Sequence, residues 1–185
     1  RNIYHKYIVV EMRNDMIDLL SDYCKKIELD ITDTQLQQFD DYYRFLVEKN
    51  KVMNLTTIIE KEDVVLKHFI DSIYIMKYTD FNEKKVIDIG TGAGFPGIPL
   101  AIMNPQTSFV LLDSLNKRIN FLNEVCNLCN LSNVITIHGR AEEISRKEEY
   151  REKFDFVVYA ILRMLTHYRT NKCSSWEIEK NMKKT

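Results

Sequence analysis

A glycine-rich turn that directly follows an apolar run constrains this chain more than any other feature. Residues 86–97 read VIDIGTGAGFPG, and a helical pattern of apolar residues follows through Ile102. Glycine tolerates positive φ and, having no Cβ, lets the backbone approach a ligand closely. The free N–H groups of the helix behind the turn then point toward whatever is bound. The segment therefore predicts a strand, a binding turn built on Gly90, Gly92 and Gly94, and a helix, an arrangement typical of nucleotide-binding domains.

Two carboxylates sharpen this prediction. Asp88 lies two residues before the first glycine, and a second apolar run ends in Asp113, 23 residues beyond Gly90. A carboxylate at the end of the neighbouring strand can accept hydrogen bonds from both hydroxyls of a ribose. An acid at position 88 fits a cationic amino-acid nucleoside better than the pyrophosphate of NAD, and S-adenosylmethionine has that character. The alternative is an ordinary tight strand-to-helix turn of another α/β domain.

Apolar runs alternate with helix-length segments through the second half of the chain. Strands are predicted at Lys85–Ile89, Ser108–Leu112, Asn133–His138 and Phe154–Tyr159, and helices at Gly97–Met103, Asn116–Cys129 and Ala141–Tyr150. A parallel, doubly wound α/β sheet of the Rossmann-like type accounts for this order, with its ligand at the carboxyl ends of the strands.

Two helices are predicted before the sheet. Thr32 and Gln35 suit a capping box at the start of the first helix, and the second is predicted from Glu62 to Tyr78. We expect them to form an N-terminal helical extension that packs across the mouth of the sheet. The predicted organisation is a poorly defined leader (residues 1–28), a helical cap (29–82), an incomplete binding domain (83–165) and a tail (166–185).

Composition limits the possible binding partners of the protein and its cellular compartment. With 185 residues, 45% hydrophobic content and a formal net charge of −1, the chain can fill one core but does not hold nucleic acid by overall charge. Its four cysteines are too scattered for a disulfide framework. Cys126-x-x-Cys129 lies in a predicted helix without a second pair, so we expect buried thiols and no metal site. No secretory leader or bilayer-length apolar run is present in the sequence, so we expect a cytoplasmic protein without membrane contact.

Five sequence motifs, taken together, resemble one family. In chain order they are VMNLT (52–56), LKHFIDS (66–72), GTGAGFP (90–96), LDSLNKR (112–118) and GRAEE (139–143). The same motifs occur in the same order in the glucose-inhibited division protein B family, bacterial methyltransferases of small-subunit ribosomal RNA. The resemblance covers residues 29–158, and motifs in register are far more specific than the glycines alone.

The resemblance implies a class I methyltransferase fold, S-adenosylmethionine as the cofactor, a monomer, and a guanine N7 atom in 16S ribosomal RNA or the small ribosomal subunit as the acceptor. It places Gly90 and Phe95 at the methionine side of the cofactor and Ala141 and Glu142 at its adenine end. Guanine N7 carries a free in-plane lone pair, so methyl transfer needs positioning without a general base, and we expect no catalytic side chain. The predicted cofactor-binding residues are Asp88, Gly90, Gly92, Gly94, Phe95, Asp113, Ala141 and Glu142.

A guanine in folded RNA must be exposed before it reacts, which requires stacking and phosphate contacts. The candidates at the mouth of the sheet are Lys67, His68, Lys117, Arg118 and Arg140. Each has an alternative interpretation. Lys117 and Arg118 open a predicted helix and fit a solvated face equally well, and His68 fits a hydrogen-bonded structural role. Glu142 would also favour a helix start through the helix dipole.

The chain departs from the family pattern near its end. Where the family continues with an arginine at the cofactor site, this sequence has Ala160, and residues 166–185 do not resemble the expected continuation. Three further strands of the family sheet are not found, which we interpret as truncation by a premature stop or a change of reading frame. An unpaired edge strand then predicts marginal stability and self-association. Three functions compete: an rRNA methyltransferase, a cofactor-binding remnant without catalysis, and a nicotinamide-dependent oxidoreductase.

Overall fold

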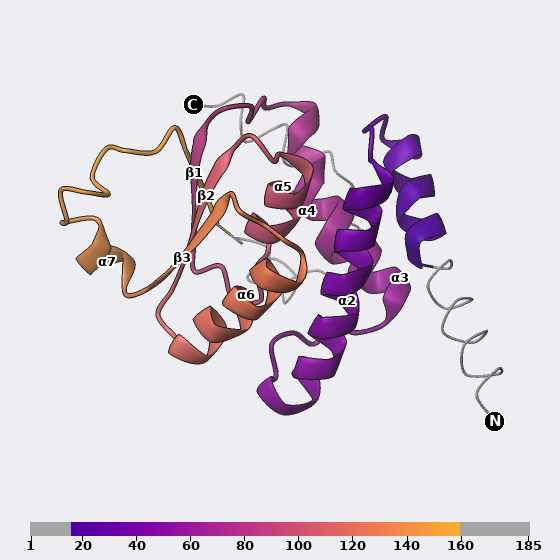
Figure 1. Cartoon of the computed structure of the whole chain (residues 1–185), viewed down its shortest axis with the longest axis horizontal. Helices are drawn as coiled ribbons and strands as arrows, with labels where there is room; N and C mark the ends of the chain where they lie inside the picture. Colours follow the sequence, from indigo (N-terminus) through magenta and orange to yellow (C-terminus); the bar gives the residue numbers. More distant parts are fainter. Residues whose placement is uncertain (1–15, 160–185) are drawn as a thin grey trace, which may run out of the picture.

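The chain folds around a parallel β-sheet, as the alternating pattern predicts. A computed structural model describes residues 16–159, and in this part of the chain four strands lie in the order β3-β2-β1-β4 (Figure 1). All three strand pairs are parallel. The strands are β1 (Lys85–Ile89), β2 (Ser108–Asp113), β3 (Val134–His138) and β4 (Phe156–Val158). The Rossmann-like α/β fold class is therefore confirmed.

Three helices follow the strands in alternation. They are α5 (Gly97–Met103), α6 (Asn116–Leu128) and α7 (Ala141–Ile144). The first two agree with the predicted ranges to within one residue, but the prediction that α7 continues to Tyr150 is wrong. Residues 145–152 form turns because, with charged side chains at most positions, they offer no apolar stripe that a longer helix could bury.

The first predicted helix is α2 (Asp33–Met53), and its start is confirmed. The Thr32 hydroxyl accepts a hydrogen bond from the Gln35 amide, and the Gln35 side chain accepts one from the Thr32 amide, which completes the capping box. The helix ends at Asn54, whose φ of 50° is left-handed. α2 packs against both α5 and α6, so it covers the helix layer that lies on the sheet (Figure 1).

The second predicted helix occupies the predicted range but is not a regular α-helix. It consists of α3 (Lys61–Val64), the π-helix η1 (Val65–Ile70), α4 (Asp71–Ile73) and the 3₁₀-helix η2 (Tyr74–Lys77). A π-turn widens the helix by one residue and changes the direction of the side chains that follow, and such turns are frequent at functional sites. The spacing of apolar residues did not reveal this irregularity.

Residues 16–26 form a helix that the sequence analysis places in the leader. Met16, Leu20 and Cys24 lie on one side of it and are fully buried in the main core. The structure thus differs from the expectation of a poorly defined leader. The three apolar residues are four positions apart, a spacing that places them on one face of a helix and favours its burial. The expectations for residues 1–15, Ala160 and the tail lie outside the described residues.

The two faces of the sheet are covered unequally. On one face Val86, Phe109 and Leu111 are buried against the layer formed by α5 and α6. The opposite face carries Ile87, Leu112 and other apolar residues, and the only helix of residues 16–159 that lies on that side is α7 (Figure 1). None of the helices between residues 16 and 159 has the length and apolar character that a membrane span requires.

Candidate functional site

The glycine turn has the backbone conformation that its sequence predicts. Gly90, Gly92 and Gly94 have φ values of 70°, 64° and 102°, which side-chain-bearing residues rarely adopt. The amides of Gly90 and Thr91 both donate to the carbonyl of Leu112, at 2.8 and 3.1 Å. The turn therefore leaves the end of β1 and lies across the end of β2, which brings it to the second predicted carboxylate.

The glycines of this turn serve different purposes. A Cβ added at Gly90 would meet no heavy atom within 4 Å, so the main chain is open on that side. A Cβ at Gly94 would lie 2.9 Å from the hydroxyl of Tyr42, and one at Gly97 would lie 2.7 Å from Asp88 Oδ2. Gly94 and Gly97 are thus required by packing, whereas Gly90 leaves room for a ligand.

Tyr42 also belongs to the site, although it is not among the residues predicted from the sequence. Its fully buried side chain extends from α2, and its hydroxyl donates to the carbonyl of Ala93 over 2.5 Å. This contact attaches the helical cap directly to the glycine turn. Helical spacing predicts that such a tyrosine is buried, but it does not tell which distant carbonyl its hydroxyl will meet.

Asp88 stabilises the glycine turn through its carboxylate. It is fully buried, and its Oδ2 accepts a hydrogen bond from the Gly97 amide at 3.0 Å. Within the described part of the chain, Asp88 Oδ1 and the Thr91 hydroxyl are buried without a hydrogen-bond partner. Burial raises the pKa of Asp88 from 3.8 to about 6, and the nearby Thr91 hydroxyl and the hydrogen bond from the Gly97 amide oppose this shift. The contact of Asp88 with a cofactor stays a prediction.

Asp113 lies where the neighbouring strand ends, and main-chain amides hold its carboxylate. Oδ2 accepts from the Gly92 amide at 2.9 Å, and Oδ1 accepts from the Leu115 amide at 2.9 Å. The Arg118 guanidinium also donates to Oδ2 at 3.2 Å, so this predicted RNA contact pairs with the predicted ribose contact. The sequence placed these residues in one motif but did not pair Arg118 with Asp113.

Phe95 is enclosed by rings from the helical cap. The imidazole of His68 stacks on it, with ring centroids 4.3 Å apart and an angle of 11° between the planes. Tyr42 and Phe69 lie tilted against Phe95 at centroid distances of 5.5 and 6.1 Å. The predicted methionine-side residue and the predicted RNA residue His68 are therefore brought into direct contact.

The predicted adenine end lies next to Asp113. The amide of Gly139 donates to the carbonyl of Asp113 at 3.1 Å, so the end of β3 joins the end of β2. Arg140 then caps α7, in which Ala141 is half-buried and Glu142 is exposed. The carboxyl ends of β1, β2 and β3 thus bring together all three parts of the predicted cofactor site, as expected for a parallel sheet.

The remaining predicted RNA residues are not gathered into one cluster. Lys67 forms an ion pair with Asp63 at 2.7 Å, one helical turn away. Lys117 and Arg140 have exposed side chains at the starts of α6 and α7. Among residues 16–159 no group of His, Cys, Asp or Glu side chains could hold a metal ion.

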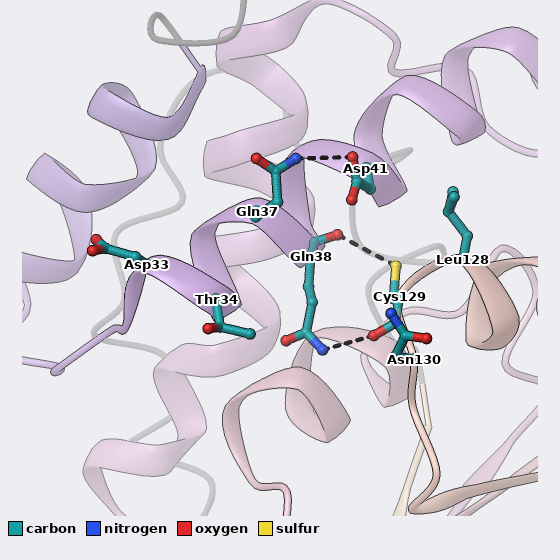
Figure 2. A pocket seen from close by; sticks show the side chains of 8 residues that line it. All are labelled: Asp33, Thr34, Gln37, Gln38, Asp41, Leu128, Cys129 and Asn130. Atoms are coloured by element: carbon teal, nitrogen blue, oxygen red, sulfur yellow. Dashed lines mark hydrogen bonds between the residues drawn. The ribbon is translucent and has the colours of Figure 1, made fainter.

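A shallow groove of about 400 Å³ lies between the start of α2 and the end of α6 (Figure 2). The side-chain amide of Gln38 donates to the Cys129 carbonyl at 2.7 Å, and the Cys129 thiol donates to the main-chain carbonyl of Gln38 at 3.4 Å. Burial raises the pKa of Cys129 to about 12 and that of Cys126 to about 11, which keeps both thiols protonated. Cys129 thus joins the end of α6 to α2, and Cys126 is half-buried against the main core.

Comparison with known proteins identifies relatives along most of the chain. The sequence profile of the family described as GidB, rRNA small subunit methyltransferase G, matches residues 35–178. Ribosomal RNA small subunit methyltransferase G of Desulforamulus reducens is 48% identical over 159 residues, covering 84% of this chain and 66% of that protein. The proteins of the same name from Lachnoclostridium phytofermentans and Clostridium perfringens are 53% and 52% identical, covering 72% and 75% of this chain and 56% and 58% of their own lengths.

The profile match continues past residue 158, where the resemblance noted in the sequence ends, and it includes part of the stretch expected to form an unrelated tail. Among solved structures, a SAM-dependent methyltransferase from Aquifex aeolicus is similar with a TM-score of 0.43 and 23% identity, over 52% of this chain and 50% of that one. The assignment rests on the sequence matches. This chain, which spans 56–66% of the length of these three curated relatives, belongs to the rRNA small subunit methyltransferase G family.

Proposed function

We propose that this chain binds S-adenosylmethionine at the glycine turn, and that the protein methylates the N7 atom of a guanine in 16S ribosomal RNA. The observation that carries the proposal is the open main chain at Gly90 beside the fixed carboxylate of Asp113. Membership of the family supports the same reaction. The proposed substrate would place the protein with ribosomes in the cytoplasm.

The residues present fit this cofactor. Asp113 Oδ1 accepts one hydrogen bond within the described residues, from Leu115, and so retains a lone pair for a ribose hydroxyl. Gly90 allows close approach of the methionine part, and Phe95 lies at the other end of the turn. In this proposal, Ala141 and Glu142 hold the adenine end.

The methyl transfer requires the side chains mainly to position the two reactants. When bound, S-adenosylmethionine supplies an electrophilic methyl group. Guanine N7 has an in-plane lone pair and no proton to lose, so the protein must hold the base in line with the bond that breaks and exclude competing geometries. Such positioning can contribute about 7–11 kcal/mol in well-oriented systems. The binding residues of the turn, with Asp113, provide a fixed reference for this alignment.

We propose that the cations around the site contact RNA phosphates. The exposed Lys117 and Arg140 lie at the starts of the helices that follow β2 and β3, at the same edge of the sheet as the glycine turn. Lys67 is 57% exposed despite its ion pair with Asp63, and it remains accessible to solvent. His68 and Arg118 are half-buried, and in this proposal they act next to the cofactor. Phosphate contacts of this kind set the position of the RNA, not the choice of base.

Calorimetric titration of this chain with S-adenosylhomocysteine tests cofactor binding, with NAD as the competing ligand. We expect binding of the first and none of the second. Asp113→Asn should weaken binding at least about tenfold because a charged acceptor is lost, and the exposed Asp30→Asn should leave affinity unchanged. Binding of NAD instead would reject the proposal. The nicotinamide-dependent oxidoreductase has no support from the relatives, all three of which are named methyltransferases.

Methyl transfer to small ribosomal subunits that lack the modification tests the second half of the proposal. Transfer would establish the activity in this chain. Cofactor binding without transfer would favour the remaining alternative, a cofactor-binding chain without catalysis.

We further infer that the chain self-associates through the thinly covered face of the sheet. Ile135 on β3 and Val157 on β4 are 65% and 54% exposed, although both are apolar and point to the same face. Parallel sheets are normally covered on both faces, and exposed apolar patches of this kind favour association.

A further inference from the structure

We propose that Thr56 is a positioning residue of the cofactor site. Its hydroxyl fixes the imidazole of His68 flat against Phe95, and through that stack it holds Phe95 at the end of the glycine turn. Thr56 touches neither the turn nor Asp113 through any described hydrogen bond, so it acts through His68. The inference rests on the proposed cofactor site and assigns to it a residue from the segment between α2 and α3.

The bonding of the Thr56 hydroxyl suits this role. Its oxygen accepts a hydrogen bond from the Ile58 amide at 3.1 Å and lies 2.9 Å from Nε2 of His68. A hydroxyl has one proton and two lone pairs, and Ile58 uses one lone pair. The proton and the second lone pair remain, so Thr56 can bond Nε2 whether that nitrogen accepts or donates. The contact therefore holds the ring in either tautomer.

Thr56 is itself held firmly. The Asn50 side chain donates to the Thr56 carbonyl at 2.9 Å, and the Thr56 amide donates to Asn50 Oδ1 at 2.9 Å. This reciprocal pair binds both main-chain groups of Thr56 to α2, close to the end of that helix. The hydroxyl is therefore presented from a fixed backbone, which is what a positioning group requires.

His68 links Thr56 to Phe95 at the end of the glycine turn. Its main chain lies in the π-helix η1, and its carbonyl accepts a hydrogen bond from the Ser72 hydroxyl at 2.5 Å. With the backbone set by the helix and Nε2 set by Thr56, both torsions of the side chain are defined. The ring then lies parallel to Phe95 at 4.3 Å, and Tyr42 and Phe69 lie tilted against the same Phe95 ring.

The test compares three variants of this chain. Thr56→Val keeps the shape of the side chain but removes the hydroxyl, Thr56→Ser keeps the hydroxyl, and Thr57→Val makes the same change at the exposed neighbouring threonine. The first readout is the NMR signal of His68 Nε2 and of the Phe95 ring protons, which needs no ligand. The second is the affinity for S-adenosylhomocysteine by calorimetry.

We expect Thr56→Val to shift both NMR signals and to weaken S-adenosylhomocysteine binding about fivefold, the effect of losing one hydrogen bond. Thr56→Ser and Thr57→Val should resemble the parent chain in both readouts. A folded Thr56→Val protein with unchanged His68 and Phe95 signals would overturn the inference. Unchanged affinity with shifted signals would overturn it as well, because the ring would then move without consequence for the site.

His68→Phe provides a second test, in which the effect of Thr56→Val is measured again in a protein that lacks the His68 nitrogen. It keeps a flat ring against Phe95 and removes the nitrogen that Thr56 bonds. If Thr56 acts through His68, adding Thr56→Val to this background should change neither the Phe95 signals nor the affinity further. Additive effects would contradict the inference. A parent chain that does not bind S-adenosylhomocysteine would reject the proposed function, and the Phe95 signals would still decide whether Thr56 positions that ring.

Discussion

The two faces of the sheet differ in how completely they are covered, and the difference separates buried core from accessible apolar surface. The face that meets α5 and α6 is buried beneath two layers of helices, since α2 packs on these helices in turn (Figure 1). On this face Leu111 is fully buried, whereas Ile135, on the opposite face, is 65% exposed. The same strands thus contribute core residues in one direction and accessible apolar surface in the other.

The candidate site shows a similar contrast between a packed side and an open edge. Asp88 and Gly97 lie on the packed side and keep the turn in shape, whereas Gly90 lies at the open edge where a ligand can approach. Residues on the packed side should therefore affect unfolding more than binding. Those at the open edge should show the reverse.

Truncation of one side chain on each face should give the largest contrast. Leu111→Ala should lower the free energy of unfolding by about 2–5 kcal/mol, because a fully buried leucine leaves a cavity. Ile135→Ala should lower it by less than about 1 kcal/mol, since most of that side chain already meets solvent. Chemical denaturation measures both. Equal losses would show that the two faces are equally well packed.

A pH titration of stability examines Asp88, a carboxylate that is buried beneath the turn on the packed face. Burial raises the pKa of Asp88 from 3.8 to about 6, so the folded state holds this proton more tightly than the unfolded state. Its contribution is then fully present below about pH 4 and is lost as the pH rises through about 6, a change of about 3 kcal/mol.

Asp88→Asn isolates this effect. The variant retains an acceptor for the Gly97 amide but does not titrate. Relative to the parent, its free energy of unfolding should therefore rise by about 3 kcal/mol between about pH 4 and pH 7. Denaturation at several pH values gives the difference. A difference that stays constant over this range would show that Asp88 does not titrate there.

Two glycine substitutions compare the packed side of the turn with its open side. Gly97→Ala places a Cβ 2.7 Å from Asp88 Oδ2 and should lower the free energy of unfolding by about 1–3 kcal/mol. Gly90→Ala meets open space and should cost about 1 kcal/mol through its positive φ. Affinity for S-adenosylhomocysteine should fall more in Gly90→Ala. The opposite order of the two affinities would place the ligand elsewhere.

The smallest effect on stability is expected from charges added to the thinly covered face. Ile135→Lys should change the free energy of unfolding by less than about 1 kcal/mol, yet it should weaken self-association because a charge resists burial in an interface. Sedimentation velocity over a range of concentrations measures the association. A parent chain that sediments as a monomer at high concentration would contradict self-association itself.

Local patterns in the sequence determined much of this fold. Alternation of apolar runs and helical spacing located β1 and α5 to the residue, and the capping box at Thr32 fixed the start of α2. These signals succeed because they arise between residues a few positions apart. The glycine spacing likewise determined positive φ in the turn, since few other residues adopt that backbone.

Pairings between distant segments were decided only by the tertiary structure. The sequence could not tell that Tyr42 bonds the turn at Ala93, that Arg118 turns back to Asp113, or that His68 stacks on Phe95. Nor did it reveal the π-turn, in which Phe69 packs against the rings of Phe39 and Tyr42 on α2. Such contacts depend on the positions of whole elements in space, and these positions follow from the packing of the entire core.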